Sequence, residues 1–274
     1  MSQQGHRYLM ESDEESVRLD RKTATDAVEK QALWAGIEPG MRVADLGCGA
    51  GKTTFVLNQL VGPAGSVVGI DMSPQRLDYA ESHYNHPGIE YVCKDIRKPL
   101  NELGMFDFVW LRFVLEYYRH DGFDIVKNIS KILNPGGILC LIDLDCNSLR
   151  HFGLSERLEK YLIEIMNIME NKFNFDPYAG IKLYAYLYDL GYQDIDVNLT
   201  PHHLIYGELK ETDNYNWTKK VEMAAKTSGC RFQDYEDGYE GFIKEFLDFF
   251  SDFRRFTYTP LISCRGRKPE VDRD

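Results

Sequence analysis

The stretch Val43-Ala44-Asp45-Leu46-Gly47-Cys48-Gly49-Ala50-Gly51 decides the fold, because an apolar run ends there in an acid and enters a glycine-rich loop. A pattern with helical spacing, Lys52 to Leu60, starts directly after this loop. A second apolar run, Val67 to Asp71, follows and also ends in an aspartate. A loop that brings its backbone against a ligand has no room for β-carbons, so Gly47 and Gly49 are the expected contact points. The pattern predicts strand, turn, helix and strand, the first half of a nucleoside-binding sheet.

Three classes of ligand compete for this loop. A phosphate loop for ATP or GTP needs four residues between its glycines, which would place the first glycine at Leu46. A dinucleotide loop has the pattern G-x-G-x-x-G, but here the third glycine falls one position early, at Gly51. Asp45, two residues before the first glycine, would repel a pyrophosphate at the helix N-terminus. It suits a ligand that carries an ammonium group.

Val43 to Gly51 resembles the first motif of the class I S-adenosylmethionine-dependent methyltransferases, and Asp71 resembles their ribose-binding acid. The resemblance implies S-adenosyl-L-methionine as the cofactor, whose α-amino group and sulfonium are both cationic. An acid before the glycines then has a physical reason. The resemblance covers residues 40–145 with specific motifs and the rest of the chain only in broad arrangement.

The resemblance also implies roles for residues after each strand. Lys94-Asp95-Ile96 follows the expected third strand, and in the family an acid here bonds the adenine amino group while the next apolar residue covers the ring. Met72 is expected against the adenine face, with core packing as its alternative. Arg112 is expected to hold the cofactor carboxylate or to orient the N-terminal leader, and a structural ion pair is its alternative. The complete set of expected cofactor-binding residues is Tyr8, Asp45, Gly47, Cys48, Gly49, Asp71, Met72, Asp95, Ile96 and Arg112.

Residues 1–38 are interpreted as a helical leader that covers the glycine loop. Ser12 and Glu15 fit a capping box, and apolar residues then recur near helical spacing. In many small-molecule methyltransferases that this chain resembles, such a leader closes on the cofactor, often with an aromatic residue. Tyr8 is the candidate here, and simple packing is its alternative.

The expected fold class is α/β: a Rossmann-like, seven-stranded, mostly parallel sheet with helices on both faces and a helical lid. Strand five is expected at Ile138 to Leu144, and strand six at Asp194 to Leu199, with a continuation to Tyr206. The last strand, Thr257 to Cys264, would insert antiparallel between them, as in the family. The Rossmann-like core is assigned to residues 39–147, 176–206 and 256–268, and the lid to residues 148–175 and 207–255.

Two features of the lid are specific enough to test. Asp237 is expected to cap a helix from Tyr239 to Phe253, with Glu240 at capping-box spacing. The lid is also rich in aromatic residues, most of which are expected in its core rather than in the wall of an acceptor pocket. These residues are Phe152, Tyr161, Phe173, Phe175, Tyr206, Trp217, Phe242, Phe246 and Phe249.

Composition limits the choice of partners and compartment. The 274 residues carry a formal charge of −11, which argues against nucleic acid. No apolar run of about eighteen residues is present, so no membrane contact is expected. Six cysteines show no CxxC pair, and Cys93 and Cys140 are expected in buried strands as reduced thiols of a cytoplasmic protein. No metal site is expected, and the chain is expected to be a monomer or homodimer.

The function that follows is methyl transfer from S-adenosylmethionine to a small-molecule acceptor. An in-line displacement at an activated methyl group needs alignment and exclusion of water, so no catalytic triad is required. A base is needed only if the acceptor must lose a proton. The candidates, among which the sequence does not choose, are Asp143, Asp145, His151, His202 and His203.

Two other classes of function stay open. A non-catalytic sensor of S-adenosylmethionine or S-adenosylhomocysteine would keep the same three acids. An NAD-dependent oxidoreductase is suggested by Tyr215 and Lys219 at Y-x-x-x-K spacing, but this pair lies far past the fifth strand.

Overall fold

The protein is described by a computed structural model for Ser16, Asp20 and residues 23–270. One mixed sheet runs through it in the order β3-β2-β1-β4-β5-β8-β6, and β7 pairs with β8. The strands are β1 (Arg42–Leu46), β2 (Ser66–Asp71), β3 (Ile89–Cys93), β4 (Phe106–Arg112), β5 (Leu133–Leu144), β6 (His151–Phe152), β7 (Gln193–Tyr206) and β8 (Phe256–Arg267). The described helices of eight or more residues are α2 (Thr25–Ala35), α3 (Lys52–Val61), α4 (Pro74–Tyr84), α5 (Gly122–Ile129), α6 (Glu156–Phe173), α7 (Ala179–Asp189), α8 (Glu211–Ser228) and α9 (Tyr239–Ser251).

The first five strands are parallel, and β8 is antiparallel to both β5 and β7. This confirms the expected Rossmann-like fold class and the insertion of the last strand. The sheet also has a short eighth strand, β6, within the segment assigned to the lid. Because the parallel strands share one direction, their carboxyl ends meet at one edge, where open α/β sheets bind ligands.

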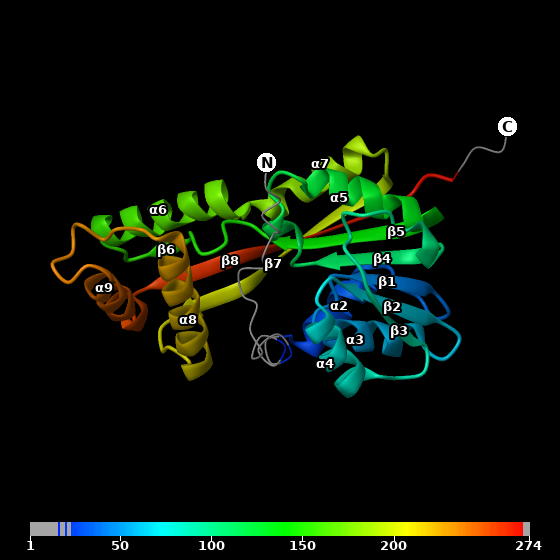
Figure 1. The fold of residues 1–274 in the computed structure, drawn as a ribbon, viewed down its shortest axis with the longest axis horizontal. Helices are drawn as coiled ribbons and strands as arrows, with labels where there is room; N and C mark the ends of the chain where they lie inside the picture. The colour runs from blue at the N-terminus through cyan, green and yellow to red at the C-terminus, as the bar shows by residue number, and fades with distance from the viewer. Residues whose placement is uncertain (1–15, 17–19, 21–22, 271–274) are drawn as a thin grey trace.

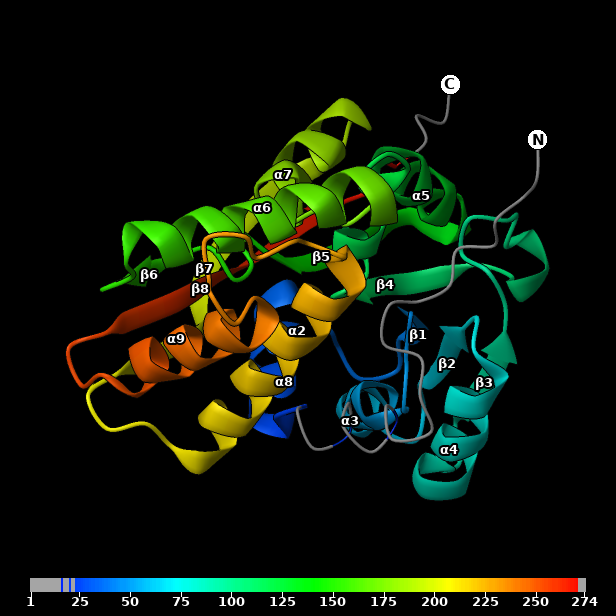
Figure 2. The same cartoon turned by 60° about the vertical axis from the view of Figure 1, so that its left-hand side comes forward.

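Three hydrophobic cores hold the layers together. One lies between the sheet and α5 and α7, and a second lies between the sheet and α2 and α3. The third lies among α6, α8 and α9. These helices fall in the segments expected to form a lid, and we call them the lid. Figure 1 shows β7 and β8 continuing from the Rossmann-like core into this lid, and Figure 2 shows α8 and α9 in front of them. The two long strands therefore connect core and lid without a break.

Strand β7 is longer than its expected first part and runs to Tyr206, as the predicted continuation required. Its pairing with β8 is irregular between Pro201 and His203. Proline has no backbone N–H to donate, which accounts for the irregularity at this position.

Two local expectations are wrong. Cys93 is exposed, because β3 is the edge strand of the sheet, whereas Cys140 in the central β5 is fully buried. Helix α9 begins after Gly238 with no side-chain cap, so Asp237 does not cap it. Asp237 instead accepts the Glu240 N–H through its backbone carbonyl, at 3.2 Å.

None of the described helices has the length and apolar character needed to cross a bilayer.

Candidate functional site

A cavity lies at the carboxyl ends of β1, β2, β3 and β4. Most of the expected cofactor residues line it, namely Gly47, Cys48, Gly49, Asp71, Met72, Asp95, Ile96 and Arg112. Asp45 is not in the lining, and Tyr8 lies outside the described residues. Thr23, Arg76 and Lys94 also line the cavity and were not expected there. Loops that are far apart in sequence thus form one site.

The glycine loop is fixed to the end of β2. The backbone N–H groups of Gly47 and Cys48 both donate to the Ile70 carbonyl, at 2.7 and 3.0 Å. Gly47 has φ +71°, and a β-carbon built on it would lie 2.5 Å from Cγ2 of Val114. Both the backbone conformation and the close approach of Val114 therefore require glycine at this position.

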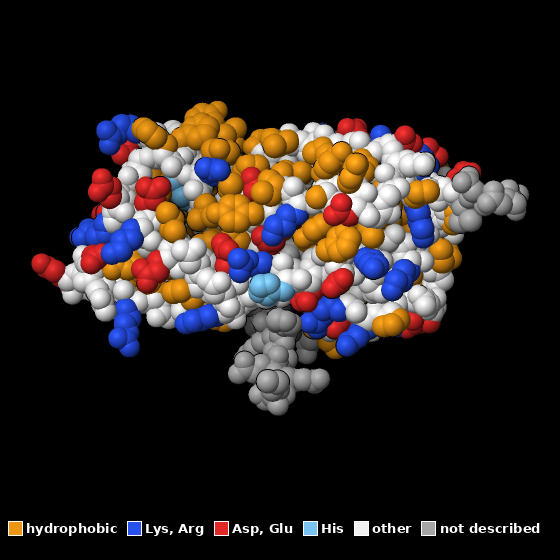
Figure 3. Space-filling model, turned by 90° about the horizontal axis from the view of Figure 1, so that it is seen from above, with side chains coloured by type: hydrophobic (Ala, Val, Ile, Leu, Met, Phe, Trp, Pro, Cys, Tyr) orange, Lys and Arg blue, Asp and Glu red, His pale blue; other side chains and the backbone are white. Residues whose placement is uncertain are grey.

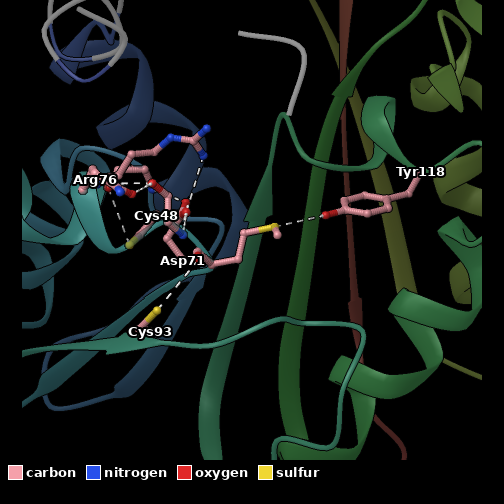
Figure 4. A network of polar contacts seen from close by, with 9 residues as sticks. Cys48, Asp71, Arg76, Cys93 and Tyr118 are labelled. Atoms are coloured by element: carbon pink, nitrogen blue, oxygen red, sulfur yellow. Dashed lines mark hydrogen bonds and ion pairs between the residues drawn. The ribbon is translucent and has the colours of Figure 1, made fainter. Parts of the chain in front are cut away.

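Asp71 is the centre of the polar contacts in the cavity (Figure 4). One carboxylate oxygen accepts the Gly49 N–H at 3.0 Å, and the other accepts the Ser73 N–H at 2.9 Å. The Arg76 guanidinium lies 3.4 Å from the second oxygen. A carboxylate has about four lone-pair positions, so these contacts leave room for a ligand hydroxyl. Arg76 lies on α4, across a strand-turn-helix boundary, and no periodic pattern in the sequence signals its contact with Asp71.

Asp45 lies behind the loop rather than at the cavity wall. It is buried, and Thr54 donates a hydrogen bond to its carboxylate at 2.7 Å. Burial raises the pKa of Asp45 to about 7, although the Thr54 hydrogen bond opposes the rise. Burial therefore disfavours a charge on Asp45, and a cationic ligand would favour it.

This pKa predicts a dependence of stability on pH. The folded pKa of Asp45 lies above its ordinary value of 3.8, so the folded state holds the proton more tightly than the unfolded state. The resulting stabilisation is complete below pH 3.8 and is lost as pH rises through about 7. We expect Asp45→Asn to flatten the decline of the melting temperature in this window.

Asp143 also has a pKa raised by burial and by the neighbouring Glu116, and it adds a decline of the same sign. The difference between wild type and Asp45→Asn isolates Asp45. Identical slopes in circular dichroism melts of the two proteins would show that Asp45 is ionised in the folded state.

The contacts of Lys52 do not support a phosphate-loop function. Its ammonium group donates to the backbone carbonyl of Asp20 at 2.8 Å and lies 3.5 Å from the Asp20 carboxylate. Tyr84 also donates to Asp20. Asp20 therefore contacts both α3 and α4 beside the cavity.

The side of the cavity after β3 contains Asp95 and Ile96. Asp95 is paired with Arg97, whose Nη2 and Nε atoms lie 2.7 and 2.9 Å from its two carboxylate oxygens. Ile96 is buried, whereas Met72 is half-exposed and its sulfur lies 3.9 Å from the Tyr118 hydroxyl (Figure 4). The apolar side chain of Ile96 and the thioether of Met72 thus line the cavity together with the Asp95 carboxylate.

Arg112 lies at the end of β4, between the cavity and α2. Its Nε donates to Gln31 of α2 at 3.1 Å, and its guanidinium lies 4.1 Å from the Phe113 ring centre. Burial lowers its pKa to about 10, so it stays cationic at neutral pH. Among the described residues no carboxylate lies within 4.0 Å of the Arg112 guanidinium, and the charges of Asp45 and Asp143 partly oppose the fall of its pKa.

Phe113 forms the wall of the cavity next to Arg112 in a strained conformation. Its φ is +58°, which is costly for a residue with a side chain, and its N–H donates to the Ile142 carbonyl at 2.9 Å. Its ring lies 5.0 Å from that of His202 in β7. Strain of this kind is common at functional sites, and here it belongs to a residue that lines the cavity.

None of the five candidate bases lines the cavity. Asp143 is buried and accepts the N–H groups of Glu116 and Leu144, at 3.2 and 2.8 Å. Burial lowers the pKa of His151 to about 4, and its ring nitrogens contact Thr257 and Ser148. No group of three metal-binding side chains occurs in the part of the chain that the structure describes.

A buried polar chain connects the cavity to the lid. Glu116, next to the cavity residue Tyr117, accepts from the Asn147 amide at 2.7 Å. Lys220 of α8 donates to the side-chain Oδ1 of Asn147 at 2.6 Å. The Tyr117 ring also lies 5.9 Å from that of Phe175. The segment after β4 is therefore fixed to the lid by both polar and aromatic contacts.

Comparison with known proteins places the central segment in a family. Residues 44–141 match the family model described as a methyltransferase domain. Demethylmenaquinone methyltransferase of Lactococcus lactis is 30% identical over 133 residues, which are 44% of this chain and 52% of that protein. The protein of the same name from Staphylococcus aureus is 30% identical over 135 residues, covering 46% and 56%. The chain thus spans about half the length of these curated relatives.

Solved structures give the same fold. Phosphoethanolamine N-methyltransferase 2 of Haemonchus contortus superposes with a TM-score of 0.56 at 16% identity, over 94% of this chain and 58% of that one. A Bacillus halodurans protein, assigned provisionally as a methyltransferase, superposes with a TM-score of 0.58 at 14% identity, over 89% and 99%. At these identities the likeness concerns the fold alone.

The fold and the site define a protein of the Rossmann-like α/β class. Its segment from residue 44 to residue 141 matches a methyltransferase domain.

Proposed function

We propose that this protein is an S-adenosylmethionine-dependent methyltransferase that acts on a small-molecule acceptor. The observation that carries the proposal is the position of Asp71 at the end of β2, where the Gly49 N–H holds its carboxylate at the cavity. A carboxylate at this point of a Rossmann-like sheet accepts hydrogen bonds from ribose hydroxyls. A methyltransferase domain surrounds it.

The residues of the cavity fit each part of this cofactor. Asp71 would hold the ribose, Met72 and Ile96 would flank the adenine, and Arg112 would bind the carboxylate of the amino acid tail. Asp45, behind the loop, would stabilise the positive charges of the amino group and the sulfonium. When bound, the cofactor supplies an activated methyl group, so the protein has to align the acceptor and exclude water.

A small molecule is the acceptor that the observations favour. The names of the matched relatives refer to demethylmenaquinone and phosphoethanolamine as substrates. The chain's charge of −11 disfavours a nucleic-acid backbone. We place the protein in the cytoplasm, because its six cysteines show no disulfide framework in the sequence.

Thermal denaturation with three ligands tests the proposed cofactor. We expect S-adenosylhomocysteine at a hundredfold excess over its Kd to add about 2.7 kcal/mol of stability, a rise of roughly 5 °C or more in melting temperature. NADH and ATP at the same concentration are expected to leave the melting temperature unchanged. Stabilisation by NADH or ATP alone would contradict the proposal.

A further inference from the structure

The strands β6, β8 and β7 form an antiparallel ribbon whose two faces differ. Toward the lid, Ile205, Thr257 and Thr259 are buried, and Ile205 belongs to the lid core. Side chains alternate between the faces of a strand, so the neighbours of these residues point the opposite way. No side chain of the opposite face belongs to the core of the lid among the residues that the structure describes.

This second face carries large apolar side chains where an antiparallel sheet facing water usually carries polar ones. In register, Phe152 pairs with Phe256, Phe256 with Tyr206, and Tyr258 with Leu204. The rings of Tyr206 and Phe256 stack with centres 6.1 Å apart. We call this surface the aromatic face; its members and exposed fractions are Phe152 71%, Leu199 65%, Tyr206 62%, Leu204 50%, Phe256 41% and Tyr258 39%.

The area of the aromatic face suits a stable protein interface. Its four aromatic residues together expose about as much as two whole aromatic side chains, on the order of 400 Å². The leucines add to this. A standard interface buries roughly 800 Å² on each partner, a little over half of it apolar. Figure 3 shows, on the face seen from above, many hydrophobic side chains among the charged ones.

The chemistry of the aromatic face points to a second copy of this chain. None of its six residues carries a charge, so the partner surface has to be uncharged and apolar as well. The chain's net charge of −11 opposes an anionic lipid surface. The aromatic face itself is a matching surface, and two such sheets pack face to face about 10 Å apart. One patch that contacts itself is the requirement of a two-fold dimer.

We propose that the aromatic face is the contact surface of a symmetric homodimer, in which the aromatic faces of two copies pack against each other. The cofactor cavity lies at a different edge of the sheet, so the dimer does not depend on the proposed function. Because each copy is acidic, screening by salt removes repulsion and strengthens the dimer.

Sedimentation equilibrium of the full chain tests this proposal. We expect wild type to sediment as a dimer of the 31.7 kDa chain, more tightly at higher salt. The double variant Phe152→Ser/Tyr206→Ser is expected to raise the dissociation constant at least about hundredfold, because central aromatic residues dominate interface energies. Tyr215→Ser, at a 62% exposed tyrosine of α8, is the matched control and should leave the dimer intact.

Three results would overturn the proposal. The first is a monomeric mass for wild type at concentrations up to about 100 µM. The second is a dimer that the double variant and the control weaken equally, while circular dichroism melts show both variants folded. The third is a monomer that floats with phosphatidylcholine or phosphatidylglycerol vesicles through the same residues, which would assign the face to a lipid surface.

Discussion

Replacing Asp71 with asparagine is expected to weaken S-adenosylhomocysteine binding by about ten- to a hundredfold. A hydrogen bond to a charged group contributes roughly 1.5 to 3 kcal/mol, and the variant removes the charge that the ribose hydroxyls would meet. It also weakens the acceptor that holds the Gly49 N–H at 3.0 Å. Isothermal titration calorimetry at fixed salt measures the effect.

Asp78→Asn provides the control for this change. Asp78 lies on α4, as Arg76 does, but its side chain is exposed and away from the cavity lining. The control should bind as wild type does. If Asp71→Asn keeps the wild-type affinity while remaining folded, the ribose assignment of Asp71 is wrong.

Gly47→Ala is expected to have the second large effect. Alanine at φ +71° costs about 1–2 kcal/mol, and its β-carbon would meet Cγ2 of Val114 at 2.5 Å. The loop or the segment after β4 has to shift, and both line the cavity. We expect a loss of about 1–3 kcal/mol in the free energy of unfolding and at least tenfold weaker cofactor binding, measured by urea denaturation and calorimetry.

Two further variants separate backbone strain from the steric clash at Gly47. Gly40→Ala carries similar strain, since Gly40 has φ +85°, but nothing lies within 4 Å of the added carbon. It should lose stability without losing affinity. Adding Val114→Ala to Gly47→Ala should restore part of the affinity. Equal affinities in Gly40→Ala and Gly47→Ala would contradict the role of the close approach.

That Asp71, Asp95 and Arg112 line one cavity was predictable because they follow directly from strands. They come at or just after the ends of parallel strands, and the topology of the sheet brings such positions together. The spacing of the glycines excluded a phosphate loop, and this spacing is also a property of residues that are close in sequence. Local sequence is enough for contacts of this type.

Contacts between distant elements were not predictable in this way. Arg112 meets Gln31 across 81 positions, and Lys220 meets Asn147 across 73. These pairs depend on how α2 and α8 pack, which no local pattern specifies. The position of β3 at the sheet edge, which exposes Cys93, is likewise a property of the whole sheet.

The lid shows the same limit. Trp217, Phe242 and Phe246 are buried, as expected for lid core, but Phe152 and Tyr206 are exposed. Phe152 lies on β6 and Tyr206 at the end of β7, and only the cross-strand register decides which face each side chain takes.

A crystal structure of the protein with S-adenosylhomocysteine tests the central claim most directly. We predict at least one ribose hydroxyl within hydrogen-bond distance of the Asp71 carboxylate, and the amino acid tail between the Gly47 loop and Arg112. A nucleoside bound elsewhere, or ribose hydroxyls out of reach of Asp71, would contradict it.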